Sequence, residues 1–142
     1  MDIAGSQIDA VERDDGSVEV TLPADTSSVP AARRYVTGRW QQLGSDMLDD
    51  VQLIVAELVS NAIRHGRPDI SLIMRVDPFA IDVAVLDHGR EMPPGEATRP
   101  DDLSGSGRGL LLVDHLAHRW GVEPLDSEPG KSVWASITRP GT

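Results

Sequence analysis

The segment AELVSNAIRHG, residues 56–66, decides how the chain is interpreted. It continues an apolar run, VQLIV, that begins at residue 51, and the combined length and periodicity predict a helix. Glu57, Asn61 and His65 recur at intervals of four within that helix. Residues four apart lie on one side of a helix, so the segment joins a core-forming surface to a line of polar groups.

The polar side of this helix has two possible explanations. At about 100° per residue, five polar side chains fall within one wedge of roughly 140°. They are Glu57, Ser60, Asn61, Arg64 and His65. A helix on a sheet with a solvated outer face has this pattern, but the apolar arc is wide enough to favour an interior cleft. In a cleft, the Asn61 amide oxygen can be one ligand of an octahedral Mg²⁺ and Glu57 can act as a general base.

The flanking segments predict one α+β domain. We expect a loose tail over residues 1–16 and a single domain over 17–142. The expected elements are a strand at 17–23, a helix from Ser27 or Ser28 to Gly44, a helix from Ser45 or Asp46 to Gly66, strands at 70–76 and 80–87, a helix at 110–120 before Gly121, and a closing hairpin from 122–125 and 131–137. This order predicts a two-layer sandwich, with a largely antiparallel mixed sheet and three helices on one face.

The composition excludes several classes of protein. The 142 residues include no cysteine and carry a formal net charge of −10. The absence of cysteine excludes a disulfide framework and a thiolate metal site, and the acidic charge argues against direct binding to nucleic acid. No secretory signal or membrane-spanning apolar run is present, so we expect a cytoplasmic protein without membrane association.

A second motif, Asp87-His88-Gly89, follows the apolar strand at 80–87. A turn explains Asp-x-Gly adequately. In the functional interpretation, the Asp87 carboxylate accepts a hydrogen bond from an exocyclic amine such as N6 of adenine. Gly89 would then let the backbone pass close to the ring.

A third motif places Gly105, Gly107 and Gly109 directly before an apolar helix. Glycine-rich backbone that leads into a helix N-terminus offers free N–H groups and a positive dipole end, which suit an anion. Arg108 can add a positive charge. The alternative is a lid hinge that binds no ligand. The spacing is neither that of a Rossmann dinucleotide site nor that of a P-loop.

Together, the three motifs resemble the N, G1 and G2 boxes of the Bergerat-fold ATPase and kinase superfamily. The resemblance is to its small stand-alone branch, the anti-sigma factor serine/threonine kinases of the actinobacterial type. The segments that carry it are ELVSNAIRHG, VLDHG, SGRGLLLVDHLAHRWGV and GKSVWASI, and it extends from about Val18 to Ile137.

The resemblance implies a site for ATP and Mg²⁺. It assigns the metal to Asn61 and the general base to Glu57, with Asp87 and Gly89 at the adenine. The residues expected along the phosphates are Gly105, Gly107, Arg108, Gly109 and Leu110. Two further expectations are that Ser132 supports the adenine-binding aspartate through water and that His65 shapes the pocket edge or caps the helix.

Two functions remain open under this resemblance. One is an anti-sigma factor with serine/threonine kinase activity toward an anti-sigma-factor antagonist, which also binds a sigma factor and forms a possible homodimer. The alternative is a non-catalytic ATP-binding module that sequesters a partner protein. We do not expect a sensor histidine kinase, because no phosphoacceptor helix hairpin precedes the domain. The 17 residues between Asp87 and Gly105 are too few for the long lid of a gyrase-like ATPase.

Overall fold

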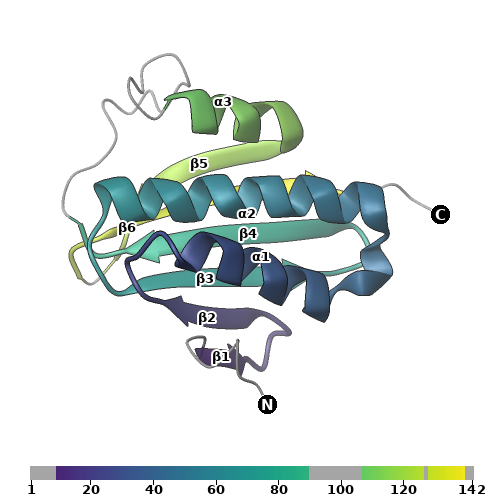
Figure 1. The fold of residues 1–142 in the computed structure, drawn as a ribbon, viewed down its shortest axis with the longest axis horizontal. Helices are drawn as coiled ribbons and strands as arrows, with labels where there is room; N and C mark the ends of the chain where they lie inside the picture. The colour runs from purple at the N-terminus through teal and green to yellow at the C-terminus, as the bar shows by residue number, and fades with distance from the viewer. Residues whose placement is uncertain (1–8, 90–106, 127, 140–142) are drawn as a thin grey trace.

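Six strands form one open sheet, and three helices cover one of its faces (Figure 1). The strand order is β1-β2-β3-β4-β6-β5, and every neighbouring pair of described strands is antiparallel. The computed structural model describes residues 9–89, 107–126 and 128–139. The elements are β1 (Asp9–Glu12), β2 (Val18–Leu22), α1 (Ser28–Arg39), the 3₁₀ helix η2 (Gln41–Leu43), α2 (Ser45–His65), β3 (Ile70–Val76), β4 (Ala80–Asp87), α3 (Gly107–Leu116), β5 (Arg119–Pro124) and β6 (Lys131–Thr138). The predicted α+β sandwich is confirmed, but its described strands contain no parallel pair, so the expected mixed character is wrong for them.

The two faces of the sheet differ in burial. Along β4 and β6, buried and half-buried residues alternate, as expected when successive side chains point to opposite faces. The buried positions are Ile81, Val83, Val85 and Asp87 in β4, and Lys131, Val133, Ala135 and Ile137 in β6. The core therefore lies between this face and the helices. Asp87 and Lys131 are the two charged residues among these buried positions.

The helix α2 is central to the helical layer. It lies between α1 and α3 and contacts both, in addition to β3, β4 and β6 (Figure 1). These three sets of neighbours explain why its apolar arc is wider than one sheet contact requires. No helix in the described part of the chain combines the length and the apolar character needed to cross a membrane.

The two long helices begin without the predicted side-chain caps. Ser27 is the N-cap of α1, but its hydroxyl donates to Asp25 Oδ2 at 3.0 Å and caps no backbone N–H. The N-cap of α2 is Gly44, at φ +88°, and not either of the two polar residues after it. The helix α1 also ends earlier than expected, at Arg39, and the 3₁₀ turn η2 connects it to α2 around the buried Trp40.

The third helix is displaced relative to the prediction of residues 110–120. It begins at Gly107 and ends at Leu116, and residues 119–124 form β5 instead. The reason is that the backbone N–H of His118 donates to the carbonyl of Ser136, at 2.8 Å, and so joins the sheet. Trp120 Nε1 then donates to Asp114 Oδ1 at 2.8 Å, which ties β5 to α3. Gly121 lies within β5 and does not stop a helix.

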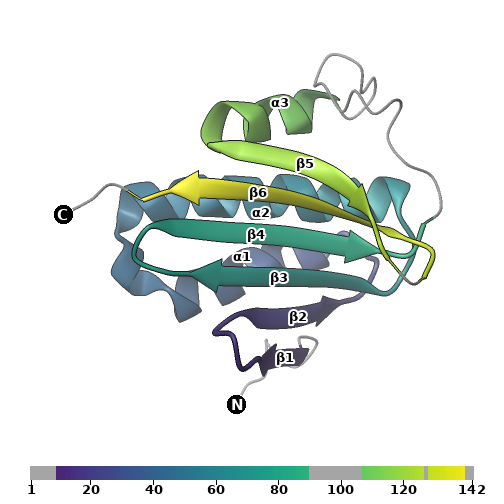
Figure 2. The same ribbon diagram turned by 180° about the vertical axis from the view of Figure 1, so that it is seen from behind.

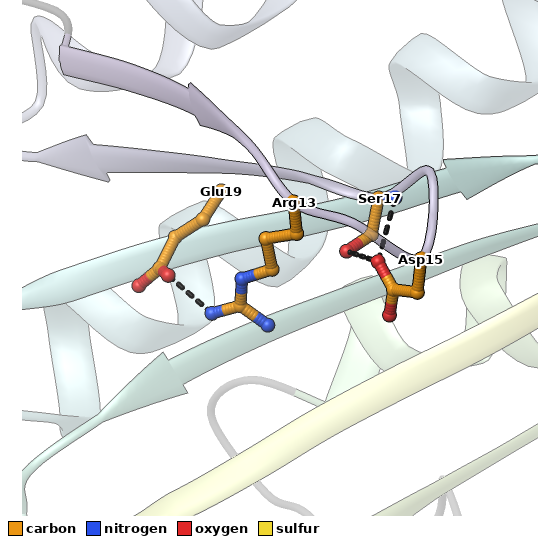
Figure 3. Close-up of polar contacts among 4 residues, drawn as sticks. All are labelled: Arg13, Asp15, Ser17 and Glu19. Atoms are coloured by element: carbon orange, nitrogen blue, oxygen red, sulfur yellow. Dashed lines mark hydrogen bonds and ion pairs between the residues drawn. The ribbon is translucent and has the colours of Figure 1, made fainter.

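The N-terminal region contains a strand that the sequence did not predict. Residues 9–12 form β1 and pair with β2, which corrects the expected loose tail for these residues. The turn between the two strands is held by Asp15 Oδ1, which accepts hydrogen bonds from the N–H and the hydroxyl of Ser17 at 2.9 and 2.7 Å (Figure 3). These bonds lower the pKa of Asp15. Arg13 forms an ion pair with Glu19 across the same turn (Figure 3).

The turn between β3 and β4 is also held by an aspartate side chain that accepts hydrogen bonds from the residues after it. Asp77 Oδ1 accepts hydrogen bonds from the backbone N–H groups of Phe79 and Ala80, at 2.7 and 2.8 Å. These two bonds hold the pKa of Asp77 below its ordinary value of 3.8. The Arg139 guanidinium donates to the Asp77 carbonyl at 2.8 Å, which connects the turn to the residue after β6.

Candidate functional site

Three segments meet at one end of the sheet. They are the C-terminal end of α2, the end of β4 and the turn between β5 and β6, and α3 lies above α2 with its beginning toward the same end (Figures 1 and 2). The backbone N–H of His88, after β4, donates to the carbonyl of Arg67, after α2, at 3.0 Å. Lys131, at the start of β6, pairs directly with Asp87, at the end of β4. Two of the predicted motifs, on α2 and after β4, are thus carried by elements that converge on one place.

Asp87 is the polar centre of this place. Its side chain is fully buried. Its Oδ1 accepts a hydrogen bond from the N–H of Gly89 at 2.7 Å and another from Lys131 Nζ at 3.1 Å. Its Oδ2 lies 3.0 Å from Lys131 Nζ, as an ion pair, yet accepts no well-aligned hydrogen bond within the described part of the protein. Oδ2 is therefore a buried acceptor whose hydrogen-bonding capacity the described residues do not fill.

Lys131 occupies the position that the sequence analysis gave to Ser132. Their neighbours in β4 are Asp87 for Lys131 and Leu86 for Ser132. Since side chains alternate along a strand, Lys131 shares the helix-covered face with Asp87, whereas Ser132 belongs to the opposite, half-buried set. The register thus disfavours the predicted support of Asp87 by Ser132. Lys131 supplies a direct ionic partner there.

Three glycines let the backbone approach Asp87 closely. A Cβ on Gly66 would lie 2.3 Å from Asp87 Cγ, and one on Gly130 would lie 2.3 Å from the Asp87 carbonyl oxygen. Gly130 also has φ +143°, which disfavours other residues. A Cβ on Gly89 would lie 3.1 Å from Asp87 Oδ1 and equally close to the Gly66 Cα. The carboxylate is therefore enclosed by backbone, and any larger residue at position 66 would displace it.

The polar wedge of α2 is enclosed unevenly. Asn61 is buried and Glu57 is half-buried, whereas His65 is exposed. A rise of about 1.5 Å per residue places Asn61 roughly 7 Å along the helix axis before Gly66. The structure therefore places the predicted metal ligand and base on the helix that ends against Asp87. The exposed position of His65 at the last residue of α2 fits an edge of the site or a helix end.

The glycine-rich motif lies partly within the described structure. Gly107, Arg108 and Gly109 form the first turn of α3, and Leu110, which follows them, is 2% exposed. The first N–H groups of a helix lack partners within it, so this turn can bind an anion. Gly105 falls outside the described residues.

Sequence reasoning missed three residues of this site. Gly66, Gly130 and Lys131 lie in segments that carry the family resemblance, but the sequence analysis gave none of them a role in the site. For Lys131 a signal existed, because the alternation of Lys131, Val133, Ala135 and Ile137 places the lysine on the apolar face of its strand. The close contacts of Gly66 and Gly130 with Asp87 leave no signal in the local sequence pattern.

Comparisons with known proteins relate the chain to one family of domains. The sequence model of the histidine kinase-like ATPase domain family matches residues 22–137. Among solved structures, the chain resembles the histidine kinase domain from the blue-light activated histidine kinase of Erythrobacter litoralis EL346, at 18% identity and a TM-score of 0.48. The match covers 82% of this chain and 61% of that chain, so this chain spans less than two thirds of its length. No curated protein sequence matches the chain.

Proposed function

The chain belongs to the family of histidine kinase-like ATPase domains, and from that premise we propose that it is an ATP- and Mg²⁺-dependent anti-sigma factor with serine/threonine kinase activity. The observation that carries the proposal is the buried Asp87 carboxylate, whose Oδ2 accepts no hydrogen bond from the described residues and which lies at the end of the helix that bears Glu57 and Asn61. The phosphoacceptor would be an anti-sigma-factor antagonist protein, and the sequestered partner would be a sigma factor.

The residues of the site fit an adenine nucleotide. Asp87 Oδ2 lacks a hydrogen-bond donor among the described residues, and an exocyclic amine supplies one. A buried acceptor without a partner is costly, so a ligand that satisfies it gains that free energy on binding. Gly66 and Gly89 leave no room for a side chain against the carboxylate, and Gly130 leaves none against the Asp87 carbonyl. Gly107, Arg108 and Gly109 at the start of α3 would receive the phosphates.

The fit to Mg²⁺ depends on Asn61. The described residues contain no group of three or more His, Cys, Asp or Glu side chains that could hold a metal ion. Mg²⁺ is commonly held by one or two protein oxygens together with waters and substrate phosphates. The buried Asn61 amide on α2 would supply such an oxygen, so metal and nucleotide would bind together.

The proposed chemistry needs a base and compensation of charge. Bound ATP would supply its terminal phosphoryl group to the hydroxyl of a serine or threonine: a new P–O bond forms to that oxygen, the bond to the β-phosphate breaks, and ADP leaves. Glu57 would take the proton of that hydroxyl on its carboxylate. The N–H groups in the first turn of α3, with Arg108, would offset the negative charge of the phosphates. The half-buried position of Glu57 supports this role, because it leaves the carboxylate accessible to a substrate side chain.

The proposed protein partners need a surface apart from the nucleotide site. An open groove lies between α1 and α2, lined in part by Arg33, Arg34 and Gln52. None of its lining residues belongs to the segments that converge on Asp87. A basic groove on a chain of net charge −10 supports an acidic surface on the partner. A homodimer remains part of the proposal.

The first test is a calorimetric titration of the purified chain with ATP, with and without Mg²⁺. We expect binding that strengthens in the presence of Mg²⁺, and the absence of ATP binding under both conditions would contradict the proposal. Phosphotransfer is tested by adding the chain and γ-labelled ATP to a lysate of its host, followed by phosphoamino-acid analysis. Nucleotide binding without labelled serine or threonine would favour the alternative, an ATP-binding module that sequesters its partner without chemistry.

A further inference from the structure

The chain contains one lysine, and that lysine is buried in the site. Twelve of the 13 basic residues are arginines, and Lys131 is the exception. Lys131 is 1% exposed and Asp87 is 0% exposed. Burial of a charged group is unfavourable unless it is paired, and each of these two groups pairs with the other. Their contact is therefore the electrostatic centre of the site.

Stability alone is a poor explanation for this ion pair. The attraction between buried charges roughly offsets the free energy of removing both from water, and apolar pairs of the same shape are often equally stable. Position 131 lies in a strand whose other inward residues are Val133, Ala135 and Ile137, so an apolar residue would fit the pattern. What an apolar residue cannot do is bind the carboxylate of Asp87.

The ammonium group constrains which oxygen of Asp87 is available. Oδ1 receives two hydrogen bonds, from Gly89 N–H and from Lys131 Nζ. Gly66 packs against the carboxylate so closely that a Cβ there would lie 2.6 Å from both oxygens. Rotation of the carboxylate would break the bonds to Oδ1 and press the group against this backbone. Lys131 Nζ also lies 3.0 Å from Oδ2 as an ion pair, but Oδ2 accepts no well-aligned hydrogen bond from the described residues, so they do not fill its hydrogen-bonding capacity.

We propose that Lys131 is a positioning residue for the nucleobase, which orients Asp87 so that Oδ2 accepts the exocyclic amine. This inference rests on the proposed binding of an adenine nucleotide. The ammonium neutralises the buried carboxylate and fixes Oδ1, and the amine of the base completes the hydrogen bonding of Oδ2. Lys131 thereby makes the site selective for a base that has a hydrogen-bond donor facing Asp87 Oδ2. Lys131 does not itself contact the base.

The main test compares ADP with purine riboside 5′-diphosphate, which lacks the exocyclic amine. We expect the unaltered chain to bind ADP at least tenfold more tightly, since hydrogen bonds to charged groups are among the strong ones. Lys131→Met should weaken ADP binding about tenfold and reduce the ratio between the two ligands toward one. Ser136→Ala, in the same strand but on the opposite face, is the matched control and should change neither quantity.

A double-mutant cycle separates positioning from direct contact. In an Asp87→Asn background, Lys131→Met should change ADP affinity by less than about twofold, because the residue through which it acts is already altered. An unchanged loss in that background, or a preserved ratio between ADP and purine riboside diphosphate, would overturn the positioning role. Unaltered ADP affinity in Lys131→Met would overturn it as well.

The unaltered chain offers a second test that does not depend on a variant folding. Labelling with ¹⁵N-lysine gives one side-chain ammonium resonance, because the chain has one lysine. This resonance should shift on addition of ADP or adenosine and remain in place on addition of tripolyphosphate. If ADP binds but the resonance does not move, the role of Lys131 is wrong while the proposed function stands. If ADP does not bind at all, both fail.

Discussion

The Cα of Gly66 lies against the carboxylate of Asp87, so closely that a Cβ there would be 2.3 Å from Asp87 Cγ. This contact joins the end of α2 to the end of β4, two elements whose sequence motifs are separated by about twenty residues. The glycine at this point is therefore required by a neighbour distant in sequence and not only by the end of a helix. The helix that carries Glu57 and Asn61 and the strand that carries Asp87 are held in fixed relation by this contact.

The first prediction concerns Gly66→Ala. The added methyl group must displace the carboxylate, so we expect ADP binding to weaken more than about tenfold, with a loss of stability of about 1–3 kcal/mol from overpacking. Isothermal titration and urea unfolding measure the two effects. Gly38→Ala on α1 is the control, because a Cβ there meets no atom within 4 Å. Equal ADP affinity in both variants would show that the contact has no part in binding.

The second prediction separates chemistry from binding. Glu57→Ala should abolish transfer of phosphate to the partner protein while ATP affinity stays within about threefold, because the half-buried carboxylate acts on the attacking hydroxyl. Intact-mass analysis of the partner after incubation with ATP measures the transfer. Phosphorylation at the normal rate by this variant would remove Glu57 from the role of base.

The third prediction concerns the metal. Asn61→Ala should remove the part of ATP affinity that depends on Mg²⁺ and leave the affinity for adenosine nearly unchanged, because the amide serves the ion and not the base. Titrations with ATP and with adenosine, each with and without Mg²⁺, give the comparison. A parallel loss for adenosine would mean that the buried Asn61 supports the fold of the site instead.

The fourth prediction tests the two neighbouring positions at the start of β6. If the register of the sheet determines which residue supports Asp87, Ser132→Ala should change ADP affinity by less than about twofold. The reason is that the Ser132 side chain belongs to the face opposite Asp87. A loss comparable to that of Lys131→Met would instead support the role that the family resemblance assigns to Ser132. The same ADP titration serves both variants.

The fifth prediction concerns acid stability. The lowered pKa of Asp77 means that its charged form is favoured in the folded protein, so its contribution to stability is full above pH 3.8 and is lost as the pH falls through the lower folded value. Asp77→Asn keeps an acceptor but not the charge. Its stability deficit in urea unfolding should be constant from pH 7 to about pH 5 and shrink below pH 3.8. A deficit independent of pH would refute this assignment.

The sequence predicted the interior of the fold better than its junctions. The strands β3 and β4 occur at the predicted residues, because alternation over seven or eight residues with a turn at Asp77 leaves little ambiguity. The boundary between α3 and β5 was missed because the apolar pattern continues to Trp120, and only the hydrogen bond from His118 to Ser136 in β6 decides where the helix ends. The strand β1 depends on pairing with β2 and has no apolar alternation of its own.

The candidate site could be anticipated only at its individual residues. Local motifs select Glu57, Asn61 and Asp87 as candidates, since each lies in a recognisable pattern of residues. The partner of Asp87 depends on strand register, which places Lys131 opposite it instead of Ser132. A local motif does not contain that information, and the same holds for the contact between Gly66 and Asp87.

The burial of Lys131 has a chemical consequence. Because no other lysine exists in the chain, the folded domain presents no lysine amine to solvent. An acylating reagent can reach the ε-amino group only when the end of β4 and the start of β6 separate locally. The rate of acylation of Lys131 therefore reports how often these two strand ends separate. A ligand that holds them together should slow the acylation. Acylation of Lys131 can thus measure this local opening in the unaltered protein.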